Sequence, residues 1–396
     1  MMANYDFSTV IERRGTGDLM HEALLPRWGR NDLLPMWVAD MGFAVCPDIV
    51  EALRRRLDHP IFGYTVEPAD YFPAIHDWVL GHHQWDVRRE WVSFIPGIVK
   101  GIGMVCNLFV QPDEKVIVMP PVYHPFFLTP RANGREVVWN PLRLREDGGY
   151  DMDFEGLERV CDDKCRVLIL CNPHNPGGIC WTRETLERLA DFCCDHHLLV
   201  VSDEIHADMA LFGHKHIPFA SVSDRAASIS ITFQAPTKTF NIAGIVSSYA
   251  IVPQAEIREK FYGWLKANEL DEAHIFAHIA TIAAFRKGEE WRRQMLAAVE
   301  SNIRFVEDFC REHIPGVRPL RPQASFLVWL DCRDLHLTHD RLIDLFVDKA
   351  RLALNDGEMF GPGGEGFMRL NVGAPRTYVE QGLRRLAGAV AVCRQE

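Results

Sequence analysis

Four short runs of apolar residues, separated by stretches with helical periodicity, constrain the fold more than any other feature of this sequence. The runs are KVIVM (115–119), RVLILC (166–171), LLVVS (198–202) and SISITF (228–233). Continuous apolar runs of this length are typical of strands that are buried on both faces, as in parallel sheets. Because parallel strands need crossover connections, the pattern predicts an α/β fold: a mainly parallel central sheet with helices on both faces.

The segments between and after these runs supply the helices. Residues 182–197 begin at Thr182, a suitable N-cap, and carry apolar residues at helical spacing. After the last run, the pattern changes to long amphipathic helices mixed with isolated strands, which predicts a smaller α+β domain. Its expected elements are helices at 254–268, 271–286, 289–313 and near 339–350, and strands at 325–331 and 366–372.

The chain of 396 residues is long enough for two domains. We expect a large α/β domain over residues 48–285. The small domain is expected to combine residues 1–47 with residues 286–396.

Composition excludes several classes of partner. The net charge of -11 disfavours a nucleic-acid partner, because phosphate backbones are bound by positive surfaces. No apolar stretch approaches the roughly 18 residues of a membrane span, and the first residues contain no apolar export segment. Eleven scattered cysteines indicate reduced thiols. We therefore expect a cytoplasmic protein with neither nucleic acid nor membrane as a partner.

A zinc site is the one metal alternative. It would use the cluster Cys193, Cys194, His196 and His197. This cluster lies late in a predicted helix, and no second pair of ligands follows at zinc-like spacing. We therefore expect no metal.

Three polar residues follow predicted strands, where open α/β sheets bind ligands. Asn172 comes directly after one strand, Asp203 after the next, and Lys238 lies five residues past the run that ends at Phe233. Each alone has an ordinary explanation: a turn, a cap or ion pair, and a solvated loop lysine. Together they predict a cleft that holds an amide, a carboxylate and an amine. Burying the carboxylate and the amine costs free energy unless a bound group pairs with them.

A phosphate site is indicated by IPGIVKGIG (95–103), in which Gly97 precedes a helical pattern. The free amides of a helix N-terminus bind anions, although Gly97 alone is also compatible with a simple tight loop. The segment GPGGEG (361–366) fits the dinucleotide pattern G-x-G-x-x-G, but no βαβ unit surrounds it.

Six separated segments resemble a known enzyme family in kind and in their order along the chain. They are CNPHNPGG, SDEIH, APTKTFN, PMWVADM (35–41), FGYT (62–65) and LNDGEMFGPGGEGFMRLN (354–371). This set is similar to the MalY/PatB branch of cystathionine β-lyase-like carbon–sulfur lyases, within the class I/II aminotransferase superfamily. The resemblance implies a fold-type I pyridoxal-phosphate-dependent transferase-like fold, pyridoxal 5'-phosphate as cofactor, a small amino-acid substrate, and a homodimer with sites at the subunit interface.

The resemblance also implies roles around the cofactor ring. Lys238 would bond covalently to the cofactor aldehyde and then act as a base. Asp203 would keep a proton on the pyridine nitrogen, and Asn172 would donate to the phenolic oxygen. Tyr123 would stack on the ring, the alternative being a core tyrosine. His206 would lie behind the cofactor or serve as an ordinary core histidine.

Other positions would bind the phosphate and the substrate. The backbone amides of Gly97, Ile98 and Val99 and the hydroxyl of Thr237 would bind the phosphate. Tyr64 would reach the phosphate of the neighbouring subunit, or it is an ordinary turn residue. Arg369 would bind the substrate α-carboxylate, with a structural ion pair as the alternative.

Three positions depart from the family pattern. Gly42 stands where aspartate is usual, and Ala235 where a phosphate-binding serine is frequent. Val246 stands where many aminotransferases have an arginine that binds phosphate. The lyase branch also tends to lack this arginine. The sequence therefore favours a lyase that acts on cystathionine or related cysteine S-conjugates. An aminotransferase is the alternative within this chemistry, and a regulatory or interaction protein is the alternative outside it.

Overall fold

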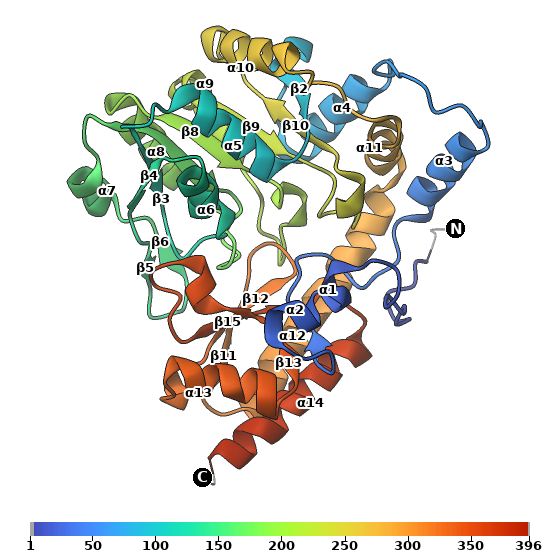
Figure 1. Cartoon of the computed structure of the whole chain (residues 1–396), viewed down its shortest axis with the longest axis vertical. Helices are drawn as coiled ribbons and strands as arrows, with labels where there is room; N and C mark the ends of the chain where they lie inside the picture. Colours follow the sequence, from blue (N-terminus) through green and yellow to red (C-terminus); the bar gives the residue numbers. More distant parts are fainter. Residues whose placement is uncertain (1–3, 395–396) are drawn as a thin grey trace.

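The computed structural model describes residues 4–394, and a seven-stranded sheet forms its centre (Figure 1). The strand order is β2-β10-β9-β8-β7-β3-β4. All neighbouring strands are parallel except at β10, which runs antiparallel to both β2 and β9. The predicted mainly parallel sheet is confirmed. The strands are β2 (Val92–Ile95), β3 (Lys115–Val118), β4 (Glu136–Trp139), β7 (Cys165–Cys171), β8 (Leu199–Asp203), β9 (Ser230–Gln234) and β10 (Ser248–Ile251).

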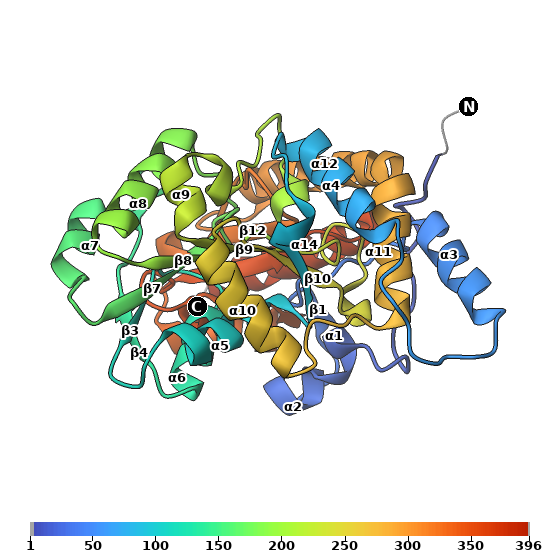
Figure 2. The same ribbon diagram turned by 90° about the horizontal axis from the view of Figure 1, so that it is seen from above.

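Helices cover both faces of this sheet, and the alternation of side chains along β7 shows why (Figure 2). Val167 and Ile169 pack on one face with α5 (Ile98–Phe109), α6 (Pro125–Ala132) and α10 (Ala255–Ala267). Leu168 and Leu170 pack on the other face with α7 (Phe154–Val160), α8 (Arg183–Asp195) and α9 (Asp224–Ser228). Since successive strand residues point to opposite faces, a strand that is apolar at every position needs both layers.

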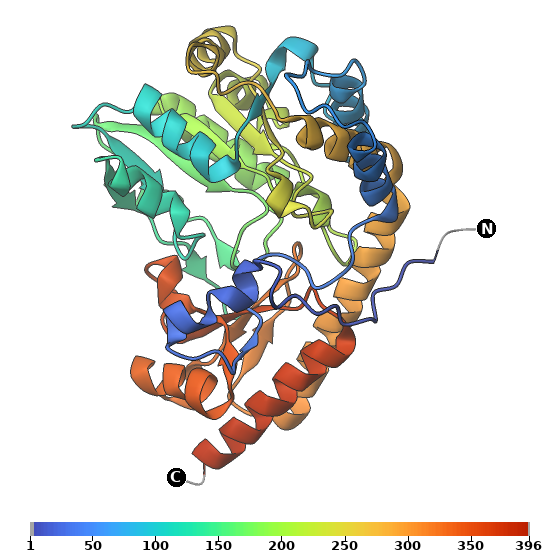
Figure 3. The ribbon, with the colours of Figure 1, turned by 45° about the vertical axis from the view of Figure 1, so that its right-hand side comes forward.

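A four-stranded antiparallel sheet forms the second structural unit, with the order β11-β12-β15-β14. Its strands are β11 (Arg318–Leu320), β12 (Leu327–Asp331), β14 (Asn355–Asp356) and β15 (Phe367–Asn371). The long helices α12 (Glu289–His313) and α14 (Arg376–Cys393) run side by side next to it (Figure 3). The chain near the N-terminus joins this unit, because β1 (Leu34–Pro35) pairs with β13 (Leu352–Ala353). The domain boundaries drawn from the sequence stay a prediction.

The remaining helices and strands connect and cover the two sheets. They are α1 (Leu19–Glu22), α2 (Leu24–Trp28), α3 (Pro47–Leu57), α4 (Tyr71–His83), β5 (Arg143–Leu144), β6 (Tyr150–Asp151), α11 (Ile275–Lys287) and α13 (His339–Asp344). Within residues 4–394 no helix has the length and apolar character needed to cross a membrane.

Two predicted boundaries were wrong, and local contacts explain them. The helix expected from residue 271 begins at Ile275, because the His274 side chain caps it by accepting from the backbone N–H of Ala277. The strand expected from residue 228 begins at Ser230, because the short helix α9 occupies the preceding residues. The helix expected near 339–350 is confirmed in extent, as an α-helix over His339–Asp344 that continues as a π-helical turn over Leu345–Lys349.

Candidate active site

A cavity of about 300 Å³, the inner cavity, lies where β7, β8 and β9 end. Parallel strands bring their carboxyl ends to one edge of a sheet, so residues far apart in sequence meet there. Eight of the predicted site residues line this cavity: Gly97, Ile98, Val99, Tyr123, Asp203, His206, Thr237 and Lys238.

Asp203 is the last residue of β8, and its carboxylate is buried. Its Oδ1 accepts a hydrogen bond of 3.0 Å from the backbone N–H of Ile205. Burial raises the pKa of Asp203 to about 7, because the charged form loses its hydration. A buried carboxylate in this state favours a cationic partner.

Lys238 lines the inner cavity together with Asp203 and sits in the loop after β9. Its Nζ donates a hydrogen bond of 2.6 Å to the backbone carbonyl of Ala39. Burial lowers the pKa of this amine to about 8, and the positive charge of Arg369 acts in the same direction. The charges of Asp40 and Asp203 oppose that shift. An amine with this pKa has a neutral fraction near pH 8 that can act as a nucleophile or a base.

The N-terminus of α5 opens onto the inner cavity. Gly97 precedes the helix with φ 127° and ψ 148°, a backbone conformation that a side chain disfavours. No side chain caps this terminus, so the amides of the first turn keep no partner within the helix. Such a terminus attracts anions through its free N–H groups and the helix dipole.

A second, wider cavity of about 830 Å³, the outer cavity, adjoins the inner one, and Lys238 and Tyr123 line both. Arg369, on β15, projects into it and is buried. Its guanidinium donates to three neutral oxygens: Asn175 Oδ1 at 2.9 Å, Asn355 Oδ1 at 2.8 Å and the carbonyl of Trp37 at 3.1 Å. Among residues 4–394 no carboxylate pairs with Arg369, and its Nε has no protein partner. Burial lowers the pKa of Arg369 to about 10.

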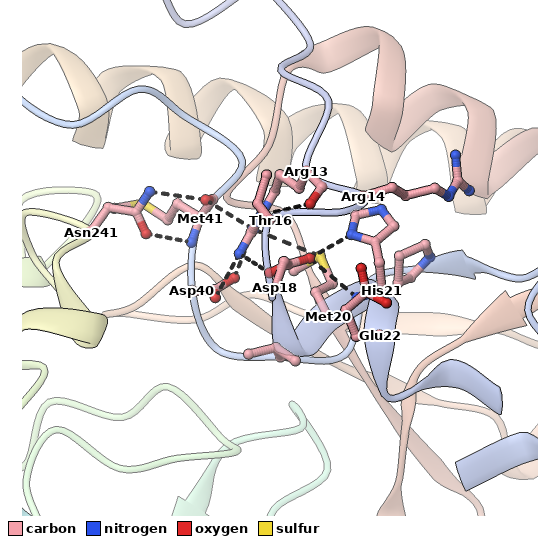
Figure 4. Close-up of polar contacts among 12 residues, drawn as sticks. Arg13, Arg14, Thr16, Asp18, Met20, His21, Glu22, Asp40, Met41 and Asn241 are labelled. Atoms are coloured by element: carbon pink, nitrogen blue, oxygen red, sulfur yellow. Dashed lines mark hydrogen bonds and ion pairs between the residues drawn. The ribbon is translucent and has the colours of Figure 1, made fainter. Parts of the chain in front are cut away.

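The segment around Asp40 forms one wall of the outer cavity (Figure 4). Asn241, three residues after Lys238, holds this wall in place by accepting from the N–H of Met41 and donating to the carbonyls of Met41 and Phe43. Arg13 adds two hydrogen bonds to the Asp40 carboxylate, at 3.0 and 2.9 Å, and also pairs with Asp18. The lysine loop and the N-terminal segment are therefore fixed relative to each other.

Three predicted residues take positions that the sequence did not define, and Asn172 is not among the residues that line either cavity. Asn172 is buried beside Asp203, and its backbone N–H donates to the carbonyl of Asp203, but its Nδ2 donates to the carbonyl of Ile217. His206 is buried in the wall of the inner cavity, and burial lowers its pKa to about 3, so it is neutral. Tyr64 is fully exposed in the loop between α3 and α4 and does not line either cavity of its own chain.

Two of the three departures from the family pattern, Gly42 and Val246, line these cavities, and Ala235 lines neither. Gly42 lines the outer cavity, and a Cβ added to it would lie 3.3 Å from Ala374 Cβ. Ala235 is buried and offers no hydroxyl. Val246 lines the inner cavity with φ 52° and ψ 64°, a left-handed conformation that is rare for a β-branched residue.

The residues around the inner cavity fit pyridoxal phosphate. The uncapped start of α5 suits the phosphate, the Lys238 amine suits the aldehyde, and the carboxylate of Asp203 suits a protonated ring nitrogen. The buried atoms without a protein partner include Asn172 Oδ1 and His206 Nδ1. Buried polar atoms are rarely left unpaired, and His206 lies in the wall of the inner cavity, so a polar group bound there would supply a partner for its Nδ1.

Sequence reasoning missed several residues that build the site. Asn175 and Asn355 orient Arg369, and Asn241 ties the lysine loop to the N-terminal segment. All three lie within the quoted segments CNPHNPGG, LNDGEMFGPGGEGFMRLN and APTKTFN, so their amides were available as a signal. Ser248, which lines the inner cavity from β10, gave no such signal because its strand was not predicted.

Comparisons with known proteins agree with this geometry. Residues 32–386 match the family described as aminotransferase class I and II. The chain is 43% identical to cystathionine beta-lyase PatB of Bacillus subtilis (strain 168), over 98% of this chain and 100% of that protein. The crystal structure of cystalysin from Treponema denticola, which contains pyridoxal 5'-phosphate, superposes with a TM-score of 0.95 at 31% identity, over 99% of this chain and 100% of the other. The pyridoxal-phosphate-bound C-S lyase from Staphylococcus hominis gives a TM-score of 0.90 at 29% identity, over 98% of each chain.

Proposed function

The chain belongs to the class I and II aminotransferase family, and from that premise we propose that it is a pyridoxal-phosphate-dependent carbon–sulfur β-lyase. Its substrates are cystathionine or related cysteine S-conjugates. One thioether and one water give one thiol, one pyruvate and one ammonium ion. The Cα–H and Cβ–S bonds break, and the sulfur leaves with its electron pair and takes up a proton. Water then replaces the amino group at the α-carbon, so the Cα–N bond breaks while the keto group of pyruvate and the ammonium ion form.

One observation carries this proposal. The enclosed amine of Lys238 lies in a cleft with the buried carboxylate of Asp203 on the inner side and the buried guanidinium of Arg369 on the outer side. Arg369 has only neutral acceptors among the described residues, although an isolated buried cation is costly. A substrate carboxylate supplies the missing charge, and the planar guanidinium matches its two oxygens.

The substrate is oriented by that contact. With its α-carboxylate on Arg369, the α-carbon lies toward Lys238, which lines the same cavity. Burial lowers the pKa of Lys238 to about 8, so the neutral amine can accept the α-proton near that pH and later return a proton. When bound, pyridoxal phosphate supplies the conjugated ring that delocalises the electron pair left on the α-carbon.

The remaining side chains would hold the cofactor. Asp203 would keep a proton on the ring nitrogen, which in turn would stabilise the aspartate in its charged form. Tyr123 would stack on the ring, and one Asn172 Nδ2 hydrogen remains available besides the one given to Ile217. The amides of Gly97, Ile98 and Val99, together with the hydroxyl of Thr237, would bind the phosphate. His206, neutral and buried, would lie behind the ring.

The proposal extends to a cytoplasmic homodimer. All eleven cysteines are free, which suits a reducing compartment. The loop between α3 and α4 exposes several large apolar side chains, and exposed apolar patches are typical of protein interfaces. The exposed apolar side chains of this loop are Ile61, Phe62, Tyr64 and Val66. In the dimer Tyr64 would reach the phosphate in the partner's site.

The test compares two assays of the purified holoenzyme. Release of thiol and pyruvate from L-cystathionine supports the lyase. Keto acid formed only when 2-oxoglutarate is added, with no thiol released from any β-thio amino acid, supports an aminotransferase and contradicts the proposal. Lys238→Ala is the control, and it should abolish thiol release. A cellular role that survives in this variant would indicate the regulatory alternative.

A further inference from the structure

The guanidinium of Arg27 lines the outer cavity together with those of Arg369 and Arg13. Arg27 lies on the short helix α2 and is exposed. Its guanidinium stacks over the indole of Trp37, with 4.3 Å to the ring centroid, and lies 5.6 Å from that of Trp28. Over residues 4–394 it forms no hydrogen bond or ion pair with the protein. This cation therefore faces the cavity with its donors free.

Trp37 fixes the two guanidiniums relative to each other. Its backbone carbonyl accepts from Arg369, and its indole ring supports Arg27. The ring itself is held, because Trp37 Nε1 donates a hydrogen bond of 3.0 Å to the carbonyl of Met20, and Trp28 packs edge-on against it at 5.3 Å. Arg27 is thus a positioned cation rather than a freely rotating surface side chain, although it is exposed.

No acid in the cavity wall neutralises Arg27. Asp40 is the one carboxylate among the described residues that line the cavity, and Arg13 donates to both of its oxygens (Figure 4). The neutral His124 side chain lies in the field of both guanidiniums: burial, then Arg369, then Arg27 lower its pKa to about 4. Arg27 and Arg369 are therefore the two guanidiniums of the outer-cavity lining that have no carboxylate partner among the described residues, whereas Arg13 is paired with Asp40.

We propose that Arg27 binds a carboxylate on the leaving-thiol side of the substrate, while Arg369 binds the α-carboxylate. The enzyme then prefers β-thioether amino acids with a second, distal carboxylate over those whose thiol portion is neutral. This inference rests on the proposed lyase function and identifies the residue that selects among its substrates. Arg27 does not touch the reacting atoms, so its contribution lies in KM rather than in kcat.

The experiment uses two substrates that differ only in charge at the distal end. They are S-(3-carboxypropyl)-L-cysteine and its neutral amide, S-(3-carbamoylpropyl)-L-cysteine, assayed for thiol release with the holoenzyme. Arg27→Gln removes the charge and keeps most of the side-chain stem. We expect kcat/KM for the acid to fall about tenfold, mainly through KM, and kcat/KM for the amide to fall no more than about threefold.

Arg131→Gln is the matched control. Arg131 is also exposed, stacks over Trp139 at 4.8 Å, and lines neither cavity. Its substitution should leave the preference for the acid unchanged. Equal loss for both substrates in Arg27→Gln, or no loss for either, would overturn the inference while the lyase function stands.

A binding measurement separates this inference from the lyase function. S-(2-carboxyethyl)-L-homocysteine has the same length but carries its sulfur on the γ-carbon, so it cannot undergo β-elimination. We expect Arg27→Gln to weaken its binding to the holoenzyme about tenfold in a tryptophan-fluorescence titration. If no thiol is released from any substrate but this difference persists, the anion site is supported and the lyase function is wrong. Equal affinity in the two proteins overturns the site.

Discussion

Replacing Asp203 with asparagine tests the electrostatic reasoning behind the site, because the structure predicts that this functional residue destabilises the cofactor-free chain. Burial raises the pKa of Asp203 from 3.8 to about 7. Between these values the folded chain holds a proton that the unfolded chain has lost, so the free energy of unfolding falls as the pH rises. At 1.36 kcal/mol per pH unit, the free energy of unfolding falls by about 4 kcal/mol between these two pKa values. The whole loss is present once the pH exceeds 7.

The amide that Asp203→Asn introduces remains neutral at every pH, and its oxygen can still accept from the N–H of Ile205. The cofactor-free variant should therefore be more stable than the cofactor-free wild type at high pH. Between pH 5 and pH 8.5 the difference in unfolding free energy should widen by about 2 to 3 kcal/mol. The same change should reduce thiol release by the holoenzyme, since the ring nitrogen would lose its carboxylate partner.

The assay is urea unfolding of the cofactor-free proteins at a fixed protomer concentration, followed by circular dichroism at both pH values. Asp208→Asn is the control, because Asp208 is also buried but accepts from Trp78 Nε1 and pairs with His83 Nε2, and its pKa is lowered to about 2. The Asp208 carboxylate is charged and hydrogen-bonded at both pH values, so its substitution should destabilise the chain at both, whereas Asp203→Asn should stabilise it at pH 8.5. A constant or narrowing difference for Asp203→Asn would refute the reasoning.

Three further outcomes follow from individual contacts. Arg369→Lys removes the planar guanidinium that three oxygens orient. Steady-state kinetics should show kcat/KM lowered about 10- to 100-fold, mostly through a higher KM. An unchanged KM would contradict the contact with the substrate carboxylate. Val246→Asn relieves a β-branched residue at φ 52° and should raise the unfolding free energy of the cofactor-free protein by about 1 kcal/mol in urea; a decrease would mean that packing of the valine outweighs its strain. Gly97→Ala forces a side chain onto φ 127° and should weaken pyridoxal phosphate binding about tenfold in an absorbance titration, whereas unchanged affinity would argue against a phosphate at the start of α5.

Those parts of the site that depend on parallel strands could be predicted from the sequence. Asn172 and Asp203 are expected to lie together because each follows an apolar run, and β7 and β8 pair up to Cys171 and Asp203. Thr182 is expected to cap its helix, and its side chain accepts from the N–H of Thr185. In both cases the information lies within one or two neighbouring elements.

Contacts between the two sheets could not be predicted in this way. Arg369 meets Asn175 only because the four-stranded sheet packs against the carboxyl edge of the seven-stranded sheet, and no local pattern encodes that packing. The direction of β10 is another example, since its four residues are all buried and carry no alternation. Arg27 lies on a helix of five residues, too short for any periodic signal, and its importance rests on its stacking with Trp37.

The most direct test of the central claim is to locate the lysine that bonds to the cofactor. The holoenzyme is reduced with borohydride, digested, and mapped by mass spectrometry. We predict a pyridoxyl adduct on Lys238. Lys100 also lines the inner cavity, so it is the natural alternative. An adduct on Lys100, or no adduct on any lysine after reconstitution with pyridoxal phosphate, would contradict the account.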